Sequence, residues 1–162
     1  MINEQDRMHL RRCVDLAAAA LVAGDEPFGS VLVSAGGDVL FEDHNHVAGG
    51  DHTQHPEFAI ARWAAQNMSP EERAQATVYT SGEHCPMCAA AHGWVGLGRI
   101  VYASSSRQLS AWLSELGARP ARVRPLPIEE IITDTVVDGP DEELAQQVRL
   151  LHVKLHAGTR DN

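Results

Sequence analysis

The chain has 162 residues, of which 44% are hydrophobic and 22% charged, as is ordinary for a globular protein. This length suits a single core, so we expect one domain over residues 1–162. The formal net charge of −9, from 13 basic and 22 acidic side chains, disfavours docking along a nucleic acid. No stretch approaches the ~20 apolar residues of a membrane span, and no leading segment is typical of a signal peptide. We therefore expect neither a membrane nor a nucleic acid as partner.

In chain order, the first predicted element is a helix over Leu10–Ala23, where apolar residues recur at helical spacing before Gly24. Two short apolar runs, Gly29–Val33 and Asp38–Phe41, flank a glycine-containing turn and predict a β-hairpin. Residues 43–54 are polar and rich in His and Gly, which is typical of an irregular loop at the edge of an active site.

Helices and strands alternate in the rest of the chain. We predict helices at Pro56–Asn67, Cys85–Val95, Arg107–Leu116 and Asp141–His156, and strands at Ala76–Thr80, Arg99–Ala103 and, as an edge strand, Val123–Leu126. Strand–helix–strand crossovers imply parallel pairing, whereas the hairpin supplies an antiparallel pair. The predicted fold is a three-layer α/β/α sandwich with a mixed five-stranded sheet. The tail after Gly158 is typical of a loose chain end.

Two segments carry the chemistry, namely His55-Pro56-Glu57 and the run from His84 to Cys88. His55, Cys85 and Cys88 offer three soft ligands, the number that a catalytic zinc ion (Zn²⁺) takes while one position stays open. Both segments begin helices, whose electropositive N-termini favour thiolate over thiol. Glu57 lies two residues beyond the histidine, near the metal without binding it. This combination favours a hydrolytic zinc site.

Other interpretations of these cysteines remain open. A lone C-x-x-C pair is also found in redox proteins, and a structural zinc site would need a fourth protein ligand, for which His84 is a candidate. Three cysteines cannot form a disulfide framework, and Cys13, among apolar residues, is most simply a small buried hydrophobe. A cytoplasmic, reducing location fits, because thiolates stay available there.

Several further residues have an ordinary structural interpretation beside the functional one. Asn45 could be a turn residue, and the histidines at 44, 46 and 52 are expected on the loop surface or pocket rim and not as metal ligands. For Trp94 and Met87 we expect core packing, while the role of His92 is open. The i,i+4 pair His152 and His156 is expected to be solvated or packed, since no third ligand is evident.

The zinc motifs and the strand–helix order around them resemble the cytidine deaminase superfamily, whose nucleobase deaminases carry an H-x-E…P-C-x-x-C signature. Pro27-Phe28-Gly29, Asn45, Tyr79-Thr80-Ser81, Trp94 and the strand Arg99–Ala103 also match. Within the superfamily the chain looks most like the branch of guanine deaminases, fungal cytosine deaminase and bacterial tRNA adenosine deaminases. The resemblance covers about residues 10–117.

The resemblance implies roles for particular residues. His55, Cys85 and Cys88 would bind zinc, and Glu57 would take a proton from water and deliver it to the ring and the departing amine. Asn45 looks like the base-binding asparagine of the family, and Phe28 would line the pocket near the ring. Members of this branch commonly form homodimers, so we expect one here.

Two positions depart from the family pattern. Pro56 stands where relatives commonly have a small residue whose backbone N–H contacts the base, and proline has no N–H. His84 stands where proline usually precedes the first cysteine, and it could reach substrate or donate to a cysteine sulfur. Both positions bear on specificity.

The leading hypothesis is a zinc-dependent hydrolytic deaminase of a small nucleobase, nucleoside or related heterocycle, with guanine, cytosine-like and aminotriazine rings all open. A tRNA adenosine deaminase is the alternative, although it needs a basic surface that this acidic chain lacks. A non-catalytic zinc-stabilised module is a third hypothesis, against which Glu57 argues.

Overall fold

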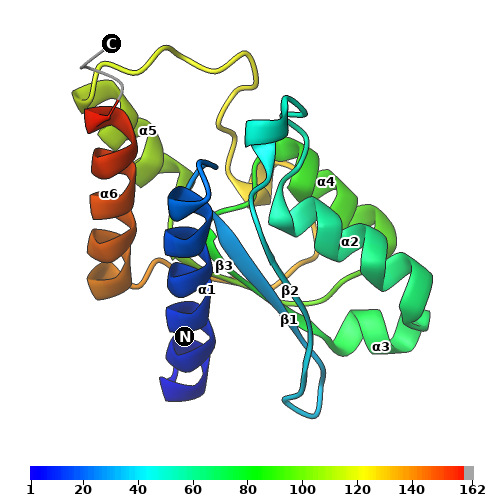
Figure 1. The fold of residues 1–162 in the computed structure, drawn as a ribbon. Helices are drawn as coiled ribbons and strands as arrows, with labels where there is room; N and C mark the ends of the chain where they lie inside the picture. The colour runs from blue at the N-terminus through cyan, green and yellow to red at the C-terminus, as the bar shows by residue number, and fades with distance from the viewer. Residues whose placement is uncertain (159–162) are drawn as a thin grey trace.

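One five-stranded sheet organises the molecule (Figure 1), whose computed structural model describes residues 1–158. The strands are β1 (Gly29–Val33), β2 (Val39–His44), β3 (Thr77–Gly82), β4 (Ile100–Ser104) and β5 (Val137–Asp138), in the spatial order β2-β1-β3-β4-β5. β1 runs antiparallel to both β2 and β3, whereas β3, β4 and β5 are parallel. The predicted mixed five-stranded sheet is confirmed.

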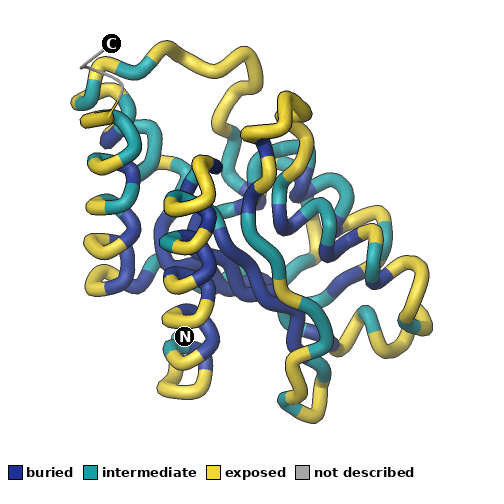
Figure 2. The backbone as a smooth tube through the Cα atoms, viewed as in Figure 1, coloured by how far each residue is buried: buried dark blue, intermediate teal, exposed yellow. Residues whose placement is uncertain are grey.

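Helices cover both faces of this sheet. They are α1 (Glu4–Val22), α2 (Pro56–Asn67), α3 (Pro70–Gln75), α4 (Pro86–Val95), α5 (Ser106–Glu115) and α6 (Glu142–Ala157), with short 3₁₀ turns η1 (Val47–Gly49) and η2 (Ile128–Glu130). In Figure 1, α1, α5 and α6 lie on one face, and α2 and α4 on the other. The central strands β1, β3 and β4 are buried (Figure 2), and with helices on both faces of the sheet this gives the predicted three layers.

Alternation along the strands divides the core in two. Val31 and Val33 of β1 pack with α1 and α6, whereas Leu32 between them packs with Ile60 and Ala64 of α2. Successive side chains of a strand point to opposite faces, so an uninterrupted apolar run is what a strand buried on both sides requires. The same division recurs in β3 and β4.

The first helix starts six residues earlier than its apolar spacing predicts. Asn3 forms a capping box with Asp6, in which the Asn3 side chain accepts from the Asp6 backbone N–H at 2.9 Å and the Asp6 carboxylate accepts from that of Asn3 at 3.0 Å. This pair satisfies two backbone donors that a helix start otherwise leaves without partners. The capping box, rather than apolar spacing, thus fixes where α1 begins.

The predicted edge strand Val123–Leu126 is wrong. Residues 121–125 form an exposed loop, and the fifth strand is β5, whose Val137 pairs with Ile100 of β4. Pro125 and Pro127 on either side of Leu126 cannot donate to a strand ladder, which accounts for the irregular backbone. α3 was not predicted either, although Ser69 and Glu72 form a capping box that starts it.

A close approach between α1 and β1 fixes the strand beside the helix. A Cβ atom on Gly29 would collide with the Cys13 carbonyl oxygen and the Leu16 Cβ, so only glycine fits at this contact. Cys13 itself is fully buried, as predicted. The contact places the next residue, Ser30, at the centre of the sheet, facing α2.

Two further predictions from the sequence concern membrane spans and the C-terminal tail. Among residues 1–158, no helix has both the length and the apolar character to cross a membrane. The tail after Gly158 lies outside the described residues.

Candidate active site

The three predicted metal ligands come together at the starts of two helices. His55 is the N-cap of α2 and Cys85 the N-cap of α4, and each helix has proline in its first position. Cys88 lies in the first turn of α4. The His55 Nδ1 atom is 3.6 Å from the Sγ atom of Cys85 and 3.6 Å from that of Cys88.

This donor set fits zinc. A tetrahedral ion with Zn–S bonds of about 2.3 Å and a Zn–N bond of about 2.0–2.1 Å holds nitrogen and sulfur roughly 3.6 Å apart, as these residues do. Within residues 1–158 the group of potential ligands here consists of His55, Cys85 and Cys88 alone. His84 is outside it, so a structural site with His84 as fourth ligand finds no support.

The two thiols differ in acidity. Hydrogen bonds from Cys88 and from His55 lower the pKa of Cys85 to about 4 despite burial, whereas the same Cys85–Cys88 interaction raises the pKa of Cys88. A cation that binds both sulfurs as thiolates displaces any proton that they carry.

Glu57, in the first turn of α2, is buried beside these ligands with 6% of its surface exposed. Burial raises the pKa of its carboxyl group, and a hydrogen bond from Thr80 opposes this. Its Oε1 atom lies 2.7 Å from the Thr80 hydroxyl and 3.0 Å from the Ser30 hydroxyl. A carboxylate with an elevated pKa close to a metal site is suited to proton transfer.

Sequence reasoning did not assign Ser30 and Thr80 to the site. The two residues are directly paired across β1 and β3, and both are fully buried. The available signal was Ser30 inside the otherwise apolar strand β1, because a buried polar group requires a partner.

Asn45 is buried just after β2, with 1% exposure. Its Oδ1 atom accepts hydrogen bonds from the backbone N–H groups of Val47 at 3.0 Å and Glu26 at 3.3 Å. Within the described chain the amide nitrogen of Asn45 donates no hydrogen bond to protein. The side chain is thus oriented with its two N–H donors left for another molecule.

Phe28 lies over the end of β3, where its ring would contact a Cβ on Gly82 at 3.2 Å. Its ring also meets that of His152 edge-on, with centroids 5.2 Å apart. This contact brings α6 next to a predicted pocket residue. His152 is buried, so of the two expectations for it, packing applies.

His84 is buried with 1% exposure, and its ring faces His92 edge-on at 5.4 Å. Neither ring nitrogen of His84 has a hydrogen-bond partner within residues 1–158, and burial lowers its pKa well below the usual value. His92 is also buried, with Nε2 2.7 Å from the Gly98 carbonyl oxygen. The prediction that Trp94 packs in the core is wrong, since the side chain is 91% exposed.

Glu83 fastens the segment before the cysteines to the C-terminal part of the chain. One carboxylate oxygen accepts from the backbone N–H of Ser106 at 2.7 Å and the other from that of Ile128 at 2.9 Å. These donors lie at the start of α5 and in η2.

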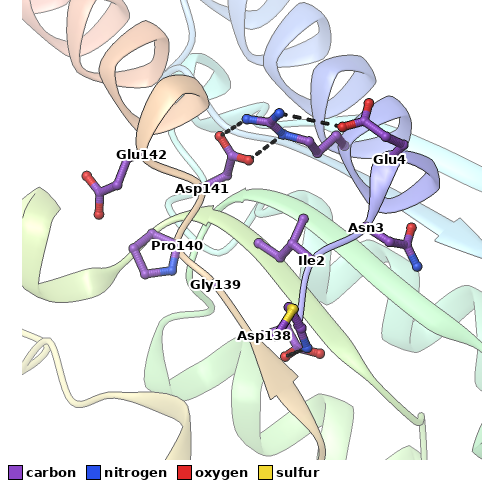
Figure 3. A pocket seen from close by; sticks show the side chains of 10 residues that line it. Ile2, Asn3, Glu4, Asp138, Gly139, Pro140, Asp141 and Glu142 are labelled. Atoms are coloured by element: carbon purple, nitrogen blue, oxygen red, sulfur yellow. Dashed lines mark hydrogen bonds and ion pairs between the residues drawn. The ribbon is translucent and has the colours of Figure 1, made fainter.

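Two pockets border the sheet at different places. One, of about 410 Å³, opens beside His55 and is lined by Phe58, Arg62 and Trp63 of α2 among others. The second, of about 620 Å³, lies between the starts of α1 and α6 (Figure 3). Its Arg7 is paired with Asp141 at 2.7 Å. Because it adjoins β5 rather than the end of β3, it is not part of this site.

Comparison with known proteins identifies the class of molecule. Residues 3–104 match the family model described as cytidine and deoxycytidylate deaminase zinc-binding region. A probable cytosine deaminase from Schizosaccharomyces pombe is 30% identical over 74% of this chain and 72% of its own. A guanine deaminase from Bacillus subtilis is 33% identical over 59% of this chain and 62% of its own.

A solved guanine deaminase from Nitrosomonas europaea superposes with a TM-score of 0.66 at 20% identity, over 97% of this chain and 86% of that one. At this identity the likeness concerns the fold. The chain belongs to the cytidine and deoxycytidylate deaminase family. It is a deaminase, and the four residues His55, Glu57, Cys85 and Cys88 all fall in the matched zinc-binding region.

Proposed function

We propose that this protein is a zinc-dependent hydrolase that removes an amino group from a small aminated heterocycle, with guanine, cytosine-like and aminotriazine rings as candidates. The observation that carries the proposal is the buried Glu57 carboxylate beside the convergent His55, Cys85 and Cys88. The proposal assigns residues 1–162 to one deaminase domain in the cytoplasm, where thiolates stay reduced.

The residues of the chain then divide the work of hydrolysis. Zinc held by His55, Cys85 and Cys88 would supply a water molecule of lowered pKa, ~7 in well-studied cases. Glu57 accepts one proton of the attacking water and passes it to the ring nitrogen, and then transfers the remaining hydroxyl proton to the departing amine. The C–N bond breaks, ammonia leaves, and the ring carbon gains the oxygen of water.

Asn45 orients the ring in this proposal. Because its Oδ1 atom is engaged by backbone N–H groups, the amide offers donors only, and the ring must present an acceptor to it. Phe28 covers the ring from the end of β3. His84 stays a predicted substrate contact, and its two ring nitrogens without partners support a role in binding a polar group.

The experiment that tests the function measures ammonia release by zinc-loaded protein with guanine, cytosine, adenine, their nucleosides and aminotriazines. We expect one ring class to react, and Glu57→Gln to lower kcat by about 10²–10⁴-fold at unchanged zinc content, because the amide cannot shuttle a proton. Glu71→Gln, at an exposed position in α3, is the matched control and keeps full activity.

Two outcomes would contradict the proposal. Full activity of Glu57→Gln would remove the proton-transfer role. Silence across the panel from protein with one zinc ion per chain would exclude a small ring and direct the assay to tRNA, despite the net charge of −9.

We further propose that the protein works as a homodimer. Trp94 supports this, since a tryptophan exposed over 91% of its surface on the helix that carries Cys88 is costly in water and suited to an interface. A second copy of the chain is the expected partner.

A further inference from the structure

A second group of potential metal ligands includes the residue that precedes Asn45. It consists of Asp25, in the turn after α1, with His44 at the end of β2 and His46 just beyond it. Each residue offers one ligand atom, and these atoms lie within 4.8 Å of one another. The two imidazole rings face each other with centroids 4.4 Å apart.

Both histidines are anchored in the way that metal ligands usually are. The Nδ1 atom of His44 is 2.8 Å from the Asn45 carbonyl oxygen, so it carries the hydrogen and leaves the Nε2 lone pair free. The Nε2 atom of His46 is 2.8 Å from a carboxylate oxygen of Asp43, which leaves Nδ1 free. A metal-binding histidine almost always donates its second ring N–H to a carbonyl or carboxylate in this manner.

Asp25 completes the group with a negative charge in a protected position. The side chain is only 7% exposed, and its Oδ1 atom accepts from the backbone N–H of Ala48 at 2.9 Å. Within residues 1–158 its second carboxylate oxygen receives no hydrogen bond. That oxygen is therefore available to a cation or to water.

We propose that Asp25, His44 and His46 form a second site for a divalent transition-metal ion, with zinc as the representative ligand. Two imidazoles and one carboxylate are suited to zinc and its neighbours in the first transition row. His46 needs only a small movement to bind the ion, because its ligand atom already lies within 4.8 Å of the other two.

An ion at this site ties the turn after α1 to the end of β2. Asn45 lies between these two segments, and its Oδ1 atom accepts from the backbone N–H of Glu26, the residue after Asp25. The second ion therefore stabilises the position of the side chain that, under the proposed function, orients the ring. The existence of the site does not depend on that function.

The test is a metal titration of the full chain after chelator treatment, with zinc alone as the probe and bound metal measured by elemental analysis. We expect two zinc ions per wild-type chain and one in Asp25→Asn, whose amide oxygen can still accept from Ala48. The double variant His44→Gln/His46→Gln should also hold one. His52→Gln, at an exposed loop histidine outside the group, should still hold two.

Cobalt distinguishes the two sites, because only thiolate ligands give a sulfur-to-metal charge-transfer band. Cys85→Ser should lose that band and keep one bound ion, whereas Asp25→Asn should keep the band. A single zinc ion in the wild type, or two in both Asp25→Asn and the double variant, would overturn the proposal. Failure of the proposed function would give a different result. No ammonia would be released, while each wild-type chain would still bind two zinc ions.

Discussion

At the scale of single residues, two hydroxyl groups converge on one oxygen of Glu57. Ser30 and Thr80 both approach Oε1, and their oxygens are also 2.9 Å from each other. The Thr80 hydroxyl has the Gly82 carbonyl as a further acceptor at 2.9 Å. Each hydroxyl has one hydrogen, so these contacts cannot all be made at once. When both hydroxyls donate to Oε1, they hold the Glu57 carboxylate in place from that side.

Replacement of Thr80 by the nearly isosteric valine should therefore disturb catalysis more than binding. We expect Thr80→Val to lower kcat by about 10–100-fold with little change in KM, because a carboxylate displaced by a fraction of an ångström loses its alignment. Steady-state kinetics with the substrate found in the ammonia assay, together with zinc content, measure this.

A matched control is available on the next strand. Ser104 is a buried residue whose hydroxyl donates to the Ser81 carbonyl oxygen at 2.7 Å, so Ser104→Ala removes a comparable hydrogen bond that does not involve Glu57. Its kcat should stay near wild type, and Thr80→Ser should retain activity. Equal kcat values for Thr80→Val and Ser104→Ala would refute a positioning role.

The convergence of the predicted metal ligands could be foreseen from the sequence because their information is local. Both motifs span a few residues, and helix starts fixed by Pro56 and Pro86 bring them together. The hydroxyl pair required the register between β1 and β3, which joins residues 50 positions apart. Trp94 was misjudged because an apolar helix residue reveals its spacing but not which side of the helix faces solvent.

At the scale of elements, α6 lies beyond the family match and contributes a buried histidine that contacts Phe28 within it. His152 packs between Phe28 and Trp112, and its Nε2 atom has no partner within residues 1–158. Burial lowers its pKa to about 4. Burial therefore favours the neutral form of the His152 ring in the folded chain.

This burial predicts a specific loss of stability in mild acid. The ordinary pKa of histidine is about 6.5, whereas that of His152 in the folded chain is about 4. Between these two pH values the unfolded chain binds a proton at His152 that the folded chain does not, so the free energy of unfolding falls as the pH is lowered. The shift corresponds to about 3 kcal/mol. In His152→Leu, the free energy of unfolding from denaturant titrations should vary less with pH over this range than in wild type. The difference should be about 3 kcal/mol.

His52→Gln serves as the control, since His52 is exposed and its replacement should leave the pH dependence as in wild type. His92, whose pKa burial also lowers to about 4, keeps part of the dependence in every variant. An unchanged slope in His152→Leu would show that His152 titrates alike in the folded and unfolded chain.

The elements differ in how well sequence predicts them. α2, α4 and α6 begin within one residue of prediction, since proline or a capping aspartate marks each start. β5 has only two residues and gains its strand geometry from pairing with β4. A strand of two residues leaves no recognisable pattern in the sequence. The fifth strand was therefore predicted at Val123–Leu126 instead.

At the scale of the whole molecule, the proposed homodimer gives a direct prediction for Trp94. Trp94→Glu should convert a dimer to a monomer at unchanged zinc content, because a charge at an interface core remains desolvated and unpaired. Sedimentation velocity at micromolar concentration measures the change.

Val123→Glu is the corresponding control, as Val123 is also an exposed apolar residue, at 56%, but lies in the loop before η2. This variant should remain dimeric. A wild-type chain that sediments as a monomer throughout the concentration range would contradict the homodimer proposal.

The two hydrogen bonds of Glu83 limit how modular this enzyme is. The family match ends at residue 104, yet Glu83 within it holds the backbone of Ser106 and Ile128 beyond it. A chimera with residues 105–158 taken from another deaminase would retain every proposed zinc ligand but would have to supply two backbone donors at the same points. Grafts that respect those two positions are the ones in which a new C-terminal half can be joined to this catalytic half.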